Sequence, residues 1–246
     1  MGTARGVERI KELTVEIVFF DAGETLVHPH PSFHELFSAV CSEAGYGISA
    51  DDVATIQGRL APHLVDLAEE TGVDNPSLSP EDSVTFWSYL YRRFLQELGI
   101  EDERLVKSLY AVFSTASSYK LYEDALPALT ELRASGYRIG LISNFEEWLE
   151  EMLVELEVGH LFDTKVISGV EGVEKPDPEI YRLALQRAGV SPGAALHVGD
   201  SPGLDVRPAQ SVGMIPVLLD RWDRYSAEEV PRIRSLEELT TVVAKF

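Results

Sequence analysis

Val-Glu-Ile-Val-Phe-Phe-Asp-Ala-Gly-Glu-Thr-Leu is the sequence of residues 15–26, and this stretch decides the fold. The first six residues are mostly apolar β-formers, which is typical of a strand buried on both faces of a parallel sheet. The strand ends at Asp21, and a glycine turn follows it. Open α/β sheets bind ligands beyond the carboxyl ends of their strands, so Asp21 is expected in a ligand site. The alternative is an ordinary aspartate in a strand-to-loop turn.

The composition predicts a globular protein. With 246 residues, 45% of them hydrophobic, the chain can bury a sizeable core as one α/β domain or a domain with an insertion. The single cysteine, Cys41, excludes an internal disulfide framework, and no run approaches the ~20 apolar residues of a membrane span. The first residues lack the apolar region of a signal peptide, so a cytoplasmic location is expected.

The charge restricts the partners. A formal net charge of −20 repels nucleic acids and anionic membrane surfaces, so neither is expected to bind. The same field would repel a phosphorylated substrate. A site for such a substrate therefore needs local positive charge from lysine, arginine or a metal ion.

Residues 31–115 are predicted to be almost wholly helical and to form a four-helix bundle with its own core. The second of these helices is expected to be kinked at Pro62. The predicted helix starts are Ser32, Ser49, Ser79 and a position near Asp102. The residues before the bundle, which include Pro29 and Pro31, are interpreted as an extended linker over the site. A metal site formed by His28, His30 and His34 is the alternative for this region.

From Tyr119 onward, helices and strands alternate, which indicates a doubly wound parallel sheet. Strands are predicted at 138–142, 165–167, 195–198 and 215–218. The first strand needs these later strands beside it to be buried. The α/β core is therefore predicted to be discontinuous, with residues 1–30 and 116–246 on either side of the inserted bundle.

Several polar residues follow the predicted strands. They are Asp21, Ser143, Asn144, Lys175, Asp200 and Asp205. Parallel strands bring such positions to one edge of the sheet. Taken singly, each residue has an ordinary structural explanation, such as a surface lysine or a turn serine. Their order along the chain favours a site.

The set suits phosphoryl transfer. Asp21 could attack phosphorus as a nucleophile, and water would then open the acyl-phosphate. Ser143 would donate to a phosphoryl oxygen, and Lys175 would neutralise the transferring group. Asp200, Asp21 and a backbone carbonyl would form the oxygen cage that Mg²⁺ prefers. Asp205 is expected to serve the same metal site, with a plain helical position as the alternative.

These motifs resemble the haloacid dehalogenase-like (HAD) hydrolase superfamily. Residues 21–26, 141–144, 175–176 and 199–214 are similar to its four motifs, and the helical insertion is similar to its C1 type of cap. The resemblance implies a Rossmann-like core, a mobile cap and Mg²⁺-dependent hydrolysis of a small phosphorylated molecule through an aspartyl intermediate. It also implies that Asn144 lies at the phosphate site and that the backbone carbonyl of Gly23 is a metal ligand.

One position departs from the family pattern. Family phosphatases carry a second aspartate, the general acid and base, where this chain has Gly23. A positioned acid/base contributes about 10² to 10⁴ in rate, so the enzyme is expected to be slow. Glu24 could substitute only if the loop is rearranged. Lys107 is the only lysine in 31–115 and lies late in the fourth helix, which disfavours a phosphonoacetaldehyde hydrolase.

Three hypotheses remain. The first is a slow Mg²⁺-dependent phosphatase-type hydrolase. The second is a catalytically quiet, metal-binding module that binds a phosphorylated ligand or a protein partner. The third is a 2-haloacid dehalogenase, which Asp200 disfavours because that reaction needs no metal carboxylate. The sequence leaves the substrate open, and it leaves a monomer or a homodimer open.

Overall fold

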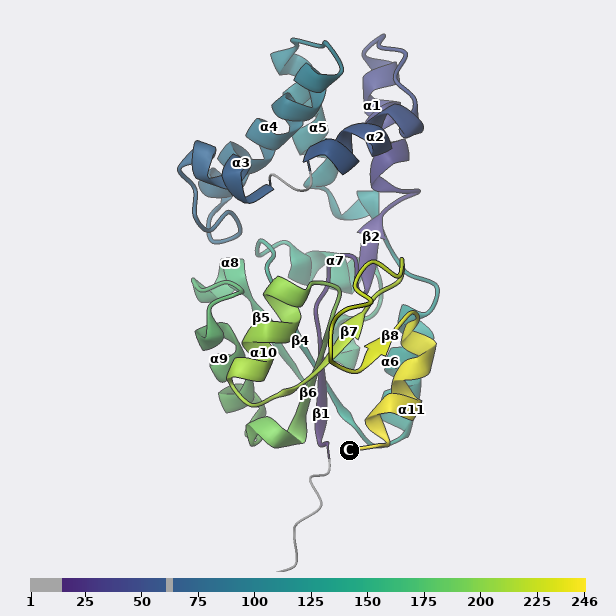
Figure 1. Cartoon of the computed structure of the whole chain (residues 1–246), viewed down its shortest axis with the longest axis vertical. Helices are drawn as coiled ribbons and strands as arrows, with labels where there is room; N and C mark the ends of the chain where they lie inside the picture. The colour runs from purple at the N-terminus through teal and green to yellow at the C-terminus, as the bar shows by residue number, and fades with distance from the viewer. Residues whose placement is uncertain (1–14, 61–63) are drawn as a thin grey trace, which may run out of the picture.

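Strand β1 (Ile17–Phe20) lies inside a six-stranded sheet in the computed structural model, which describes residues 15–60 and 64–246. The strand order is β5-β4-β1-β6-β7-β8, and every neighbouring pair is parallel. All four side chains of β1 are fully buried, because helices cover both faces of the sheet. The doubly wound, Rossmann-like α/β fold predicted from the sequence is confirmed (Figure 1).

The other strands follow the predicted positions closely. They are β4 (Arg138–Ser143), β5 (Thr164–Ile167), β6 (Ala195–Gly199), β7 (Ile215–Leu219) and β8 (Arg232–Ile233). The edge strand β8 has only two residues and was not predicted, because a pair of residues carries no periodic pattern.

Alternate residues of β1 face the two helical layers. Val18 and Phe20 belong to the core formed with α6 (Ala125–Ala134), α7 (Leu149–Glu155) and α11 (Leu239–Val243). Ile17 and Phe19 belong to the core formed with α9 (Pro178–Ala188) and α10 (Arg207–Ser211). A single helical turn, α8 (Ser168–Glu171), follows β5 directly.

Five described helices lie between β2 (Val27–Pro29) and β3 (Tyr119–Leu121), and we refer to residues 31–115 as the cap. The helices are α1 (Phe33–Glu43), α2 (Ala50–Leu60), α3 (Leu64–Thr71), α4 (Pro80–Glu97) and α5 (Glu103–Phe113). The predicted second helix covers both α2 and α3. The predicted kink at Pro62 and the lead-in at 3–13 lie outside the described residues.

The cap has an apolar core of its own, which includes Phe37, Leu95 and Leu109. Strands β2 and β3 pair antiparallel and form the two connections between the cap and the sheet domain (Figure 1). None of the helices in the described part of the chain is long and apolar enough to cross a membrane.

Candidate active site

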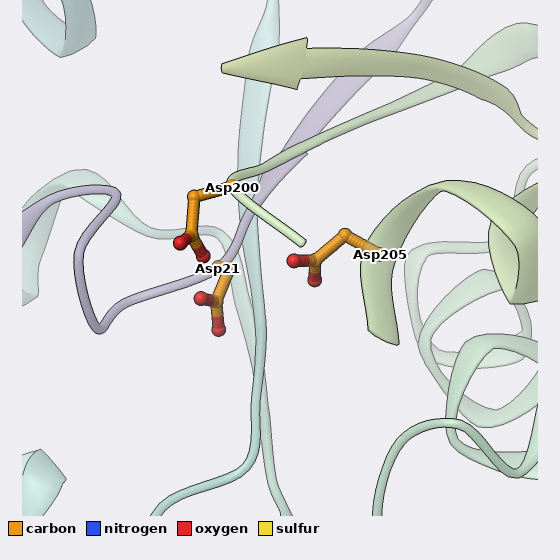
Figure 2. Close-up of side chains that lie close together, drawn as sticks. All are labelled: Asp21, Asp200 and Asp205. Carbon is orange, nitrogen blue, oxygen red and sulfur yellow. The ribbon is translucent and has the colours of Figure 1, made fainter. Parts of the chain in front are cut away.

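Three central strands bring polar residues to one edge of the sheet. Asp21 follows β1, Ser143 ends β4, and Asp200 follows β6, and these strands are neighbours in the sheet. Figure 2 shows the carboxylates of Asp21 and Asp200 close together, with Asp205 approaching from the following helical turn. One carboxylate oxygen from each of the three aspartates lies within 4.8 Å of the others. The edge of the sheet therefore holds a concentrated negative charge.

Lys175 is the cation of this cluster. Its Nζ lies 2.7 Å from Asp21 Oδ1 and 2.7 Å from Asp205 Oδ1, and the residue is 3% exposed. Burial alone would lower the pKa of Lys175, but the Asp205 and Asp21 carboxylates raise it above its usual range. The Ser143 hydroxyl donates to Asp21 Oδ1 at 2.9 Å. Burial raises the pKa of Asp21, although Lys175 and Ser143 counteract that effect.

Asn144 holds the loop that carries Lys175. The main-chain N–H of Lys175 donates to Asn144 Oδ1 at 2.6 Å, and Asn144 Nδ2 donates to the Lys175 carbonyl at 2.7 Å. The oxygen and the nitrogen of the Asn144 amide are thus both bonded to the main chain of Lys175. These contacts hold the Lys175 main chain in place, and the phosphate-binding role that the resemblance implies for Asn144 stays a prediction.

Asp205 lies in the π-helical turn η5 (Pro202–Val206) and is held by several donors. Its Oδ1 accepts from His197 Nε2 at 3.1 Å as well as from Lys175, and its Oδ2 accepts from the Ser201 N–H at 3.0 Å. Burial would raise the pKa of Asp205, but Lys175 and His197 hold it well below its usual range. A Cβ on Gly199 would lie 2.2 Å from Asp205 Cγ, so only glycine admits this close approach.

His197 is a site residue that was not predicted from the sequence. It is 1% exposed and lies within β6, where the other residues are alanine, leucine, valine and glycine. A polar side chain in an otherwise apolar buried strand needs a partner, and this was the available signal.

Asp200 has a different environment from Asp21 and Asp205. No hydrogen bond or ion pair of its carboxylate occurs within the described residues, whereas Lys175 contacts the other two. Burial, together with Asp21 and Asp205, raises the pKa of Asp200 to about 8. Three carboxylates against one ammonium leave an excess of two negative charges when all are ionised. Oxygen ligands with this excess fit a hard divalent cation such as Mg²⁺.

The loop after Asp21 carries Glu24, which the sequence analysis considered as a substitute for the acid missing at Gly23. Glu24 is exposed, has a left-handed backbone (φ 55°), and accepts a hydrogen bond from the Tyr122 hydroxyl at 2.7 Å. The Arg221 guanidinium stacks 3.9 Å over the Tyr122 ring and donates to the Thr25 carbonyl at 2.9 Å. A Cβ added at Gly23 would meet nothing within 4 Å. The loop thus has room for a Cβ at position 23, while Glu24 is bound to Tyr122.

In the described part of the chain, His28, His30 and His34 do not form a cluster that could hold a metal. In residues 15–60 and 64–246, the one cluster of histidine, cysteine or acidic side chains that could hold a metal is formed by Asp21, Asp200 and Asp205. His28 Nδ1 lies 2.8 Å from the Pro29 carbonyl, and His34 Nε2 lies 2.5 Å from Gln57 Oε1. The metal interpretation of these histidines is not supported.

Comparison with known proteins connects this geometry with a family. A family model described as haloacid dehalogenase-like hydrolase matches residues 15–213. The chain is 28% identical over 236 residues to haloacid dehalogenase-like hydrolase domain-containing protein 3 of Mus musculus, covering 93% of this chain and 92% of that protein. It is 38% identical over 158 residues to phosphoserine phosphatase of Thermus thermophilus, covering 63% of this chain and 64% of that enzyme.

Among solved structures, the HAD-hydrolase YfnB of Bacillus subtilis shares the fold. The TM-score is 0.73 at 18% identity, and the match covers 94% of this chain and 99% of that one. That protein is described as bound to magnesium, in a crystal form that reveals interdomain movement.

Proposed function

Since the chain belongs to the haloacid dehalogenase-like hydrolase family, we propose that it is a slow Mg²⁺-dependent phosphatase that hydrolyses a small phosphorylated molecule. The observation that carries this proposal is the buried contact of Lys175 Nζ with Asp21, 2.7 Å away, beside a second aspartate that lacks a cationic partner among the described residues. A nucleophilic carboxylate, a fixed ammonium and a metal-type carboxylate are the groups that such a reaction needs.

In the proposed first step, Asp21 attacks phosphorus. A bond forms between an Asp21 oxygen and phosphorus, and the bond from phosphorus to the ester oxygen breaks with its electron pair. In the second step water attacks phosphorus, the Asp21–phosphorus bond breaks, and inorganic phosphate leaves. Lys175 and Ser143 both contact Asp21 Oδ1, so they orient the carboxylate and leave its other oxygen for the attack.

The metal would be held by Asp21, Asp200 and the backbone carbonyl of Gly23. A bound Mg²⁺ supplies positive charge that offsets the repulsion between an anionic substrate and an anionic nucleophile. We assign Asp205 a positioning role toward Lys175, because Lys175, His197 and Ser201 already donate to its carboxylate.

The weak step is proton transfer to the leaving group. Position 23 carries no acid, and the Glu24 carboxylate accepts from Tyr122. The leaving oxygen must then take its proton from solvent, so esters of good leaving groups should react far faster than alkyl esters. This leaving-group dependence distinguishes a slow phosphatase from one with a complete acid/base.

A catalytically quiet module that binds a phosphorylated ligand or a protein partner is the second candidate, favoured by the same two observations on Gly23 and Glu24. Dehalogenation is disfavoured by the half-buried Asp200 in the carboxylate cluster, which would serve no purpose in a metal-free reaction. A cytoplasmic location is proposed from the single buried Cys41, which suits a reducing compartment.

The decisive experiment measures phosphate release from a panel of aryl and alkyl monoesters, with Mg²⁺ and with a chelator. We expect turnover that depends on Mg²⁺ and is abolished in Asp21→Asn. If no substrate is turned over faster than by Asp21→Asn, the hydrolase proposal fails. Halide release from 2-haloacids without added metal would instead support the dehalogenase.

A further inference from the structure

The cap contacts the sheet domain close to the catalytic lysine. The loop of residues 72–79, between α3 and α4, reaches toward α8 (Figure 1). The N–H of Ser77 donates to Glu174 Oε2 at 3.1 Å, and the Ser77 hydroxyl donates to the same oxygen. The Ser77 hydroxyl also lies 2.6 Å from the Ser168 hydroxyl. Glu174 is 7% exposed and Ser168 is fully buried, so these hydrogen bonds form inside the cap–core junction.

The main chains of the cap and the core also lie close together at this junction, at Ser77 and Gly169. A Cβ on Gly169 would lie 2.9 Å from the Ser77 carbonyl oxygen and 2.9 Å from Glu146 Cα. Neither contact involves a flexible side chain, so the cap loop could not keep this position over an alanine. At the N-terminal end of α4, the fully buried Ser83 donates its hydroxyl to Glu146, which gives a second serine–carboxylate contact between cap and core.

The core residues that contact the cap are linked to the candidate active site by the chain and by hydrogen bonds. Glu174 directly precedes Lys175, whose main chain is held on both sides by Asn144. Ser168 accepts from the Phe145 N–H at 2.9 Å and lies 3.0 Å from the Phe145 carbonyl. The loops after β4 and α8 therefore form one hydrogen-bonded unit, and Ser77 contacts that unit from the cap.

We propose that Ser77 is a positioning residue of the reaction, which acts through Glu174 and Ser168 to hold the Lys175 loop in place when the cap is docked. In the docked arrangement the ammonium of Lys175 is fixed between its two aspartates. When the cap moves away, Glu174 loses two donors and the loop has fewer constraints.

The catalytic part of this inference rests on the proposed function, but the coupling itself can be measured without activity. Hydrogen exchange of the full chain would be compared among the wild type, Ser77→Ala, Glu174→Gln and Gly169→Ala. Ser108→Ala, an exposed serine on α5, is the matched control. We expect faster exchange in both 72–79 and 168–175 in the three junction variants, and no change in the control. Ser77→Thr, which keeps the hydroxyl, should restore protection.

With an aryl phosphate as substrate, Ser77→Ala should lower kcat by about tenfold, as for loss of a hydrogen bond to a charged group. The double variant Ser77→Ala/Glu174→Gln should be no slower than the more affected single variant, since both changes act on the same Ser77–Glu174 contact. Unchanged exchange at 168–175 in both Ser77→Ala and Glu174→Gln would overturn the inference. Absence of wild-type activity, with the expected exchange pattern, would refute only the hydrolase proposal.

Discussion

Lys175 Nζ lies 2.7 Å from Asp21 Oδ1, although the two residues are 154 positions apart in the sequence. The ion pair is buried, and the lysine is equally close to a second carboxylate, that of Asp205. An ammonium between two carboxylates in a desolvated site stays protonated, so it orients the nucleophile electrostatically and does not act as a base.

Replacement of Lys175 by methionine tests this relationship. It leaves two buried carboxylates without their cation, and breaking a buried ion pair costs about 3–5 kcal/mol. We expect that loss in the free energy of unfolding, measured with urea, and a fall in activity of about 10² or more. The control is Lys165→Met, which breaks a partly exposed ion pair with Glu150 worth about 0–1 kcal/mol.

The double variant Lys175→Met/Asp205→Asn separates stability from catalysis. It removes one unpaired charge, so part of the stability should return while activity stays lost. A Lys175→Met enzyme as stable and active as the wild type would contradict the assigned role.

Gly23→Asp is predicted to raise activity. An added Cβ meets nothing within 4 Å at this position, so a side chain can start here without a clash. A positioned general acid contributes about 10² to 10⁴ in rate, and the gain should be largest for alkyl phosphates. Steady-state rates on alkyl and aryl esters would be compared with those of Gly23→Ala, which adds the Cβ without the acid. An inactive Gly23→Asp that still binds Mg²⁺ would favour the binding module.

The raised pKa of Asp200 leads us to predict that, in the absence of metal, the stability of the protein depends on pH. Its folded pKa is about 8, against about 3.9 for an unperturbed aspartate. Between these values the folded state binds more protons than the unfolded state, so the free energy of unfolding falls as pH rises from about 4 to 8. The thermal midpoint of the wild type in a chelator should therefore decline relative to that of Asp200→Asn, by roughly 2–4 °C for each kcal/mol.

Mg²⁺ should reverse this decline, because the ion binds the ionised carboxylate. At pH 7 its binding is expected to release about one proton from Asp200. Calorimetry in two buffers with different ionisation enthalpies measures that release. A wild-type midpoint that stays level or rises with pH relative to Asp200→Asn would show that folding does not raise the pKa of this carboxyl.

Glu24→Gln is expected to change kcat by less than about threefold, far below the contribution of a positioned acid/base. The reason is that its carboxylate is exposed and accepts from the Tyr122 hydroxyl at 2.7 Å. Tyr122→Phe, which frees the carboxylate, provides the comparison in the same assay. A fall of about 10² in Glu24→Gln alone would identify Glu24 as the proton donor after all.

Local sequence patterns were sufficient to predict most of the secondary structure. The apolar run that became β1 and the serine caps at Ser32 and Ser79 act over a few residues, so they can be recognised without a fold. The two-residue β8 has no such local pattern.

The sequence by itself determined that Asp21, Ser143 and Asp200 gather at one edge of the sheet, because parallel strands align their carboxyl ends whatever the side chains do. Only the tertiary structure decided the partners of each polar group. Asn144 binds the Lys175 backbone, Glu24 binds Tyr122, and Ser77 binds Glu174, and these pairs are 31 to 98 residues apart. A polar side chain can bond to any complementary group within about 3 Å, so its partner depends on how distant segments pack.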